Sequence, residues 1–174
     1  MTETPAHHGR AGADPTEQSR WRPLRILQAA MDRDIARLYE EHGLADLRPR
    51  FAMPLIRLGR GGPMTIRQLA DSLDVTHSAM SQTVSALRRR GLVHSVPGAD
   101  ARTREVALTD RAREIVPFLE AEWRSTERAL ADLEAEIPYP LSRVVVDIEA
   151  ALDRRSFHDR IVAHLERTDP GRDR

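Results

Sequence analysis

One stretch decides the fold: residues 65–109, TIRQLADSLDVTHSAMSQTVSALRRRGLVHSVPGADARTREVALT. Thr65 lies three residues before Gln68, which is the spacing of a reciprocal capping box at the start of a helix. Apolar residues then recur at spacings of three and four, as they do on one face of a helix: Ile66, Leu69, Ala70 and Leu73. The sequence therefore predicts a short helix from Ile66 to about Leu73.

A second helix is predicted from His77 to Arg90. The hydroxyl of Thr76 is suited to cap its first turn. Val75 is apolar between polar neighbours, so we expect its side chain to plug the turn between the two helices. The inward face of the second helix is predicted to consist of Met80, Val84 and Leu87. Gly91 is expected to end the helix in the left-handed conformation.

The outward face of this second helix carries small and polar side chains: His77, Ser78, Ala79, Ser81, Gln82 and Ser85. Small side chains let a helix lie deep in a DNA major groove, which is about 12 Å wide. The amide of Gln82 can make a bidentate contact to N6 and N7 of adenine. We therefore expect this face to contact bases. The candidate DNA contacts at the helix ends are Thr65, Thr76, Arg88 and Arg89.

Two β-favouring runs follow, at 92–96 and 103–108, with turn-favouring residues between them. They predict a hairpin with Arg102 and Arg104 flanking its tip. An arginine at such a tip can enter the minor groove of A·T-rich DNA, where the negative potential is enhanced. Asp100 can orient this arginine through a bidentate pair, so all three residues are candidate DNA contacts.

Two helices and an arginine-tipped hairpin are the layout of a winged helix-turn-helix. The residues resemble the MarR-type transcriptional regulators over nearly the whole chain. The resemblance is sharpest at the wing, in Asp100-x-Arg102 followed by Val106-x-Leu108-Thr109. It implies a mainly α fold with a small β-hairpin wing, in which terminal helices pair two subunits. Many relatives carry arginine where this chain has Gln82, so the operator sequences of the family do not carry over.

Composition and the resemblance together give the expected organisation of the chain. Residues 1–20 are expected to form a flexible arm, and residues 21–174 a single domain. Within this domain we expect a DNA-binding lobe at 45–110 and dimerisation helices at 21–43 and 111–168. Amphipathic spacing predicts helices at Trp21–Glu41, 46–58, 115–137 and 141–165.

Two irregularities are predicted in these flanking helices. Pro54 should kink the second helix, and a bend is expected near Ser156 in the last one. The long terminal helices can either cover the core of their own subunit or pair with a second copy. By the resemblance they interlock with a second subunit, and a two-fold dimer also explains recognition of a palindrome.

Composition and charge agree with a DNA-binding domain. The chain has 174 residues, of which 40% are hydrophobic, and a mean hydropathy of −0.51, as in globular domains. The net charge is zero, but residues 60–113 hold nine arginines and five acidic residues, a local charge of +4. Since the chain has no apolar run of about 20 residues and no signal peptide, we expect a cytoplasmic location without a membrane partner.

Other classes of function lack their motifs. There is no cysteine, which excludes disulfides and thiol-based sensing. The sequence has no glycine-rich phosphate loop, no nucleophile and general base at a recognisable spacing, and no ligands at the spacing of a zinc site. We therefore expect neither an enzyme nor a cofactor. The seven histidines are scattered, and no metal site is expected.

These observations predict a homodimeric repressor of a palindromic double-stranded DNA operator. By the resemblance, a small aromatic or phenolic effector would act between the dimer helices and the DNA-binding lobe. Candidate wall residues for this ligand are Met31, Ile35, Tyr39, Met53 and Ile56, for which ordinary core packing is the alternative. Two other functions stay open: a sequence-tolerant architectural DNA-binding protein, and a winged helix used only for protein contact.

Overall fold

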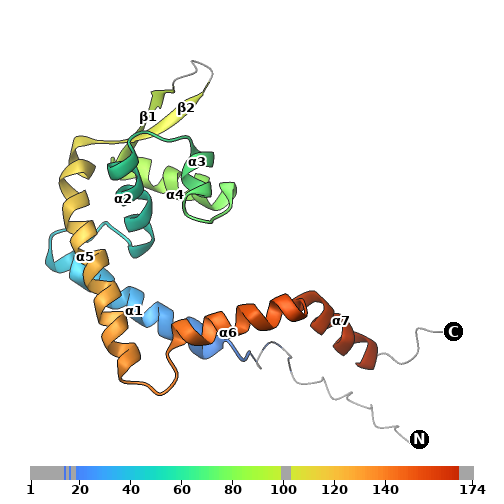
Figure 1. Cartoon of the computed structure of the whole chain (residues 1–174). Helices are drawn as coiled ribbons and strands as arrows, with labels where there is room; N and C mark the ends of the chain where they lie inside the picture. Colours follow the sequence, from blue (N-terminus) through green and yellow to red (C-terminus); the bar gives the residue numbers. More distant parts are fainter. Residues whose placement is uncertain (1–13, 15, 17–18, 99–102, 169–174) are drawn as a thin grey trace, which may run out of the picture. The chain divides into compact units, whose positions relative to one another are not determined.

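The computed structural model describes residues 14, 16, 19–98 and 103–168. Helices dominate the described residues, and the one sheet among them is a two-stranded hairpin (Figure 1). The chain divides into two compact units, Met1–Val116 and Pro117–Arg174. None of the helices in the described part of the chain is long and apolar enough to span a membrane.

The first unit opens with α1, Arg22–Glu41, close to the predicted bounds. A proline in its first turn is tolerated there because that N–H has no partner within the helix. His42 and Gly43 end α1, with Gly43 in the left-handed region at φ 74°. Both ends of this helix therefore agree with the sequence.

The helix expected at 46–58 begins later. A 3₁₀ turn, η2 (Pro49–Phe51), comes first, and α2 follows at Ala52–Gly61. Pro54 is consequently the third residue of α2, where an N–H would have no intrahelical partner. The expected kink at Pro54 is thus not required, because the sequence pattern placed the helix start too early.

The two central helices form as predicted. In α3 (Ile66–Asp71), the N–H of Gln68 donates to Thr65 Oγ1 at 3.1 Å, and the N–H of Thr65 donates to Gln68 Oε1 at 2.9 Å. This pair of bonds is the capping box. In α4 (His77–Arg89), Thr76 Oγ1 accepts from the N–H of Ala79 at 3.2 Å. Both helix starts are confirmed by a side-chain cap.

The turn between α3 and α4 differs from the expectation for Val75. Its side chain is 42% exposed and does not plug the turn. Instead the backbone N–H of Val75 donates to the carbonyl of Ala70 at 3.1 Å, and the preceding Asp74 takes a left-handed φ of 52°. The turn is therefore closed by a backbone bond, without the Val75 side chain.

The wing is an antiparallel pair of strands, β1 (Val93–Pro97) and β2 (Arg104–Leu108). Both strands start one residue later than predicted. An isolated bridge joins Met64 to the middle of β2, where the N–H of Val106 donates to the carbonyl of Met64 at 2.7 Å. Gly98 N–H donates to the carbonyl of Thr103 at 3.0 Å, which closes the described part of the hairpin.

The core of the first unit lies among α2, α3, α4 and the hairpin. Its fully buried side chains include Phe51, Leu55, Leu69, Val84, Leu87, Leu92 and Val106. Gly59 in α2 allows a close approach to Val116, in the helix that leaves the wing, since an added Cβ would lie 2.9 Å from Val116 Cγ1. Gly91, at φ 65°, is the left-handed residue that the sequence predicts after α4.

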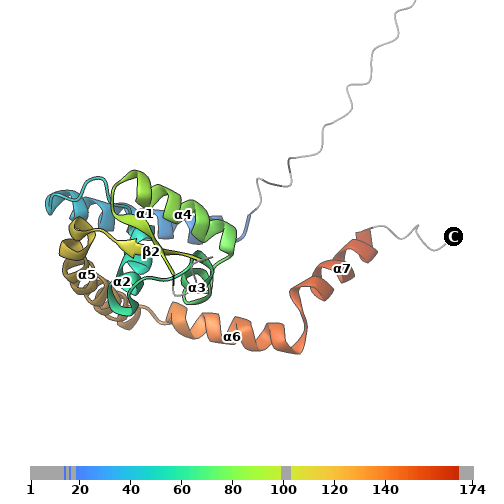
Figure 2. The same cartoon turned by 90° about the horizontal axis from the view of Figure 1, so that it is seen from above.

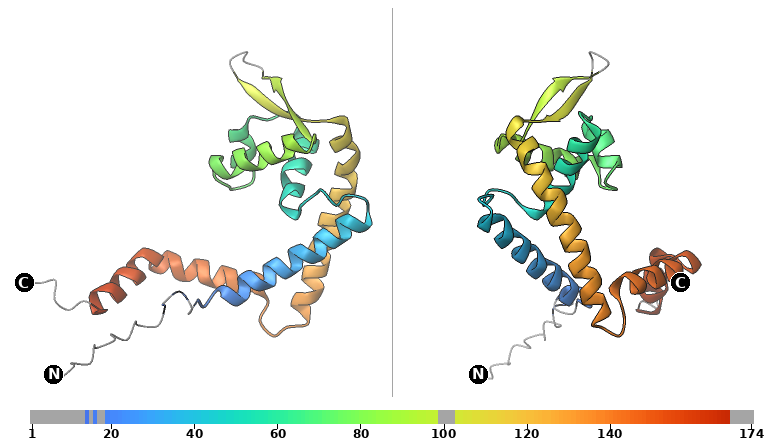
Figure 3. Two further views of the ribbon diagram at one scale, coloured as in Figure 1. Left: turned by 180° about the vertical axis from the view of Figure 1, so that it is seen from behind. Right: turned by 60° about the vertical axis from the view of Figure 1, so that its left-hand side comes forward.

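The helix that leaves the wing, α5, spans Asp110–Ala135 and continues through Pro117 into the second unit (Figure 3). Its start is capped by Thr109, whose Oγ1 accepts from the N–H of Ala112 at 3.3 Å. Downstream, Ser142 donates to the Glu134 carboxylate from its hydroxyl at 2.6 Å and its N–H at 2.7 Å. These two bonds lower the pKa of Glu134 from its usual value and fix the turn after α5.

The last predicted helix is in fact two helices, α6 (Leu141–Arg154) and α7 (Phe157–Thr168), as Figure 2 shows. The break is at Arg155, whose backbone is extended. Ser156 Oγ then accepts from the N–H of Asp159 at 3.1 Å, which caps the new helix. The bend expected near Ser156 is therefore a full interruption, because a capping serine offers the backbone an alternative to the continuous helix.

Candidate DNA-binding site

The faces of α4 divide as the sequence predicts. Met80, Val84 and Leu87 are at most 3% exposed and pack inward, together with Ala86. The outward face is exposed at His77, Ser78, Ala79, Gln82 and Ser85, and half-buried at Ser81. The helix has no acidic residue and ends in Arg88 and Arg89, which are both exposed. Such a face can contact bases without repelling phosphates.

The C-terminal end of α4 is held by two arginines that sequence reasoning did not single out. Arg90 donates to the carbonyl of Ala86 at 3.1 Å and to the carbonyl of Asp46 at 2.9 Å. Arg111 donates to the Arg90 carbonyl at 3.1 Å and to the Asp46 carboxylate at 2.9 Å. Side chains thus satisfy the carbonyls of Ala86 and Arg90, while the carbonyls of Leu87 and Arg88 accept from backbone N–H groups of the following turn. No local pattern reveals these bonds, since Asp46 is 44 residues from Arg90 and 65 from Arg111.

The wing is anchored to α4 through one of the candidate DNA contacts. Arg88 Nη2 donates to Ser95 Oγ in β1 at 2.7 Å. Arg104 is exposed at the start of β2. Asp100 and Arg102 lie outside the described residues. Of the candidates in the helices, Thr65 and Thr76 already serve as helix caps.

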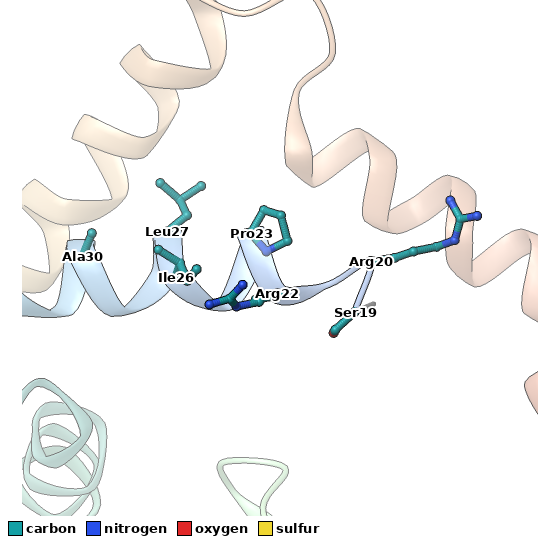
Figure 4. A pocket seen from close by; sticks show the side chains of 7 residues that line it. All are labelled: Ser19, Arg20, Arg22, Pro23, Ile26, Leu27 and Ala30. Carbon is teal, nitrogen blue, oxygen red and sulfur yellow. The ribbon is translucent and has the colours of Figure 1, made fainter. Parts of the chain in front are cut away.

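The five candidate ligand residues differ in their surroundings. Tyr39 is completely buried, Met53 is 39% exposed, and Met31, Ile35 and Ile56 are half-buried. A broad open pocket of about 810 Å³ lies instead along residues 19–30, with Pro23, Leu27 and Ala30 on one side of α1 (Figure 4). None of the five candidates lines this pocket.

The described residues contain no group of three or more histidine, aspartate or glutamate side chains placed to hold a metal ion. What these residues do assemble is a set of amide, hydroxyl and guanidinium groups on the outside of the first unit. Groups of these kinds donate hydrogen bonds to DNA bases and phosphates.

Comparison with known proteins bears on both the sequence and the fold. Residues 55–103 match the MarR family. No curated protein matches the chain. The MepR–DNA complex of S. aureus is similar in structure, with a TM-score of 0.59 and 17% identity, over 79% of this chain and 98% of that one.

Two further solved structures are similar. The transcriptional regulator SlyA has a TM-score of 0.55 and 13% identity, over 83% of this chain and 99% of that one. The regulator MOSR of M. tuberculosis, solved with DNA, has a TM-score of 0.54 and 20% identity, over 79% and 99% of the two chains. At these identities the likeness shows a shared fold. Residues 55–103 are a MarR-family segment, and the chain has the mainly helical winged helix-turn-helix fold of the MarR-type transcriptional regulators.

Proposed function

We propose that this chain is a homodimeric repressor that binds a palindromic operator through α4. The observation that carries the proposal is the outward face of α4, which is exposed, free of acidic residues and built of small or polar side chains. In winged helix-turn-helix proteins the second helix of the motif enters the major groove. The wing, with Arg102 and Arg104, would then contact the adjacent minor groove.

The proposal of a dimer rests on the second unit. None of the residues of α6 is buried, yet Leu141, Val145 and Leu152 are large apolar residues on one side of it. In α7, Phe157, Ile161 and Leu165 recur every four residues and are also exposed. Contiguous exposed apolar surface marks an interaction site. A second copy is the partner that also matches a palindromic site, because two-fold symmetry then relates both the subunits and the half-sites.

An effector is part of the same proposal. A small aromatic or phenolic ligand bound near Met31, Ile35, Tyr39, Met53 and Ile56 would release the operator if it bound more tightly to a conformation that does not fit DNA. Such a ligand must weaken DNA binding by the same factor by which DNA weakens ligand binding. Titration of the ligand with and without operator duplex measures one factor, and titration of the duplex with and without the ligand measures the other.

The operator itself can be found by selecting fragments of sheared genomic DNA with the purified protein, followed by sequencing at near-physiological salt. We expect a single enriched palindrome. Broad enrichment without a motif would favour the architectural alternative, because such a protein follows DNA shape more than sequence. The absence of any enrichment would favour a winged helix used for protein contact.

Gln82→Ala is expected to weaken binding to the enriched operator by about 1–3 kcal/mol, and to have little effect on a random duplex. Gln82 is exposed on α4, and in the proposed complex its amide contacts a base edge. Fluorescence anisotropy with both duplexes at one salt concentration measures the difference. Gln28→Ala in α1 removes an exposed glutamine outside the motif and serves as the control. Equal losses on the two duplexes would show that Gln82 does not contact bases.

A further inference from the structure

A shallow depression of about 420 Å³ lies against the outward side of α4. Ser81, Gln82, Ser85 and Arg89 line it from α4, and Arg50 lines it from η2. The depression therefore joins the outward face of α4 to a residue more than thirty positions earlier in the chain. The sequence motif alone gives no reason to include Arg50 in the DNA-binding surface.

Arg50 is placed by an aromatic platform. Its guanidinium carbon lies 5.3 Å from the centre of the Phe51 ring. The guanidinium carbon of Arg90 lies 5.1 Å from the same centre, and Arg90 is itself fixed by bonds to two backbone carbonyls. Phe51 is completely buried. A guanidinium that stacks on a fixed ring loses less conformational freedom when it binds a partner.

The depression carries positive charge. Arg50 and Arg89 are both exposed, and no acidic side chain occurs among the residues described as lining it. The hydroxyls of Ser81 and Ser85 add neutral donors. Guanidinium groups beside hydroxyls form the donor set with which proteins hold DNA phosphates. The depression is thus suited to an anion and is next to the face that is proposed to enter the major groove.

We propose that Arg50 binds a backbone phosphate of the DNA strand at the edge of the major groove occupied by α4, with Arg89 beside it. This inference rests on the proposed function, because it needs α4 in the groove. A phosphate contact carries no sequence information and instead fixes the position of the protein on the duplex. The contact between Arg50 of η2 and the phosphate would fix the position of α4 in the groove, so that Gln82 lies against the bases.

The test is the salt dependence of binding to a random duplex, which requires no knowledge of the operator. Arg50→Ala is expected to reduce the slope of log K against log salt by about 0.9 for each protomer bound. The loss of affinity should be the same factor on random and operator DNA. Arg50→Lys should restore the slope, since it keeps the charge. Arg57→Ala removes an exposed arginine of α2 that does not line the depression, and should leave the slope unchanged.

The outcomes separate the two proposals. A wild-type protein that binds no duplex would overturn the DNA-binding function and this inference together. If the wild-type protein binds DNA and Arg50→Ala has the same salt slope as the wild type, the inference alone is overturned. A loss confined to the operator would also overturn it, because a phosphate contact is independent of sequence. Should Arg50→Ala expose the Phe51 ring and unfold the protein, Arg50→Gln provides a second variant, because it keeps a polar side chain with a planar end group but removes the charge, and it should show the same change in slope.

Discussion

Val145→Asp is expected to convert the proposed dimer into a monomer and to lower operator affinity by about 10²–10⁴-fold. The side chain is 45% exposed on α6, on the same side as Leu141, Ile148 and Leu152, at steps of four, three and four residues. Burying a carboxylate in an apolar interface without a partner is strongly unfavourable. A monomer also loses the gain in affinity that comes from binding two half-sites at once. This gain is typically about 10²–10⁴-fold, which is the expected loss of operator affinity.

Sedimentation equilibrium measures the change in mass, and anisotropy with the operator duplex measures the change in affinity. Ala150→Asp adds the same charge to an exposed position on the opposite side of α6, so it should leave the mass unchanged. The helical circular dichroism of Val145→Asp should equal that of the wild type, because α6 contributes no buried residue.

A second variant tests the same interface from another helix. Leu133 is 44% exposed on α5, within the apolar stripe that the sequence predicts to pair subunits. Leu133→Asp should also shift the protein towards monomer. If both variants remain dimeric and bind the operator normally, these stripes lie outside the subunit interface, and the proposed dimer must form elsewhere.

The features that depend on local contacts could be predicted from the sequence. The capping box at Thr65, the cap at Thr76 and the left-handed Gly91 each depend on residues within a few positions, and all three are confirmed. The buried face of α4 follows equally from the helical repeat. These features position the outward face of α4, and so the core of the candidate site was visible in the sequence.

Features that depend on tertiary contacts, or on competing backbone contacts, could not be predicted in this way. Val75 is apolar, but a backbone bond closes its turn and its side chain is exposed. The apolar repeat across 141–165 is continuous, yet the cap at Ser156 divides it into two helices. The stack of Arg50 and Arg90 on Phe51 joins distant segments, and no spacing rule could find it.

Leu87→Ala is expected to lower the free energy of unfolding by about 2–5 kcal/mol. Leu87 is completely buried and is the last of the three apolar residues on the inward face of α4. Its removal leaves a cavity beneath the helix that carries the DNA-binding side chains, and a close-packed core relaxes only in part around such a cavity. Because a domain of this size has only about 5–15 kcal/mol of stability, the change is a large share of the total.

Urea unfolding followed by circular dichroism measures this loss, with Ser85→Ala as the control. Ser85 lies two residues earlier on the exposed face of the same helix, so its replacement should change stability by no more than about 0.5 kcal/mol. The two variants should also differ in DNA binding. Ser85→Ala can weaken binding without loss of stability, because it changes the outward face of α4. Leu87→Ala should weaken binding only through the fraction of protein that is unfolded, and this loss should shrink on cooling towards the temperature of maximum stability. A Leu87→Ala protein as stable as the wild type would show that α4 does not depend on this side chain for its place in the core.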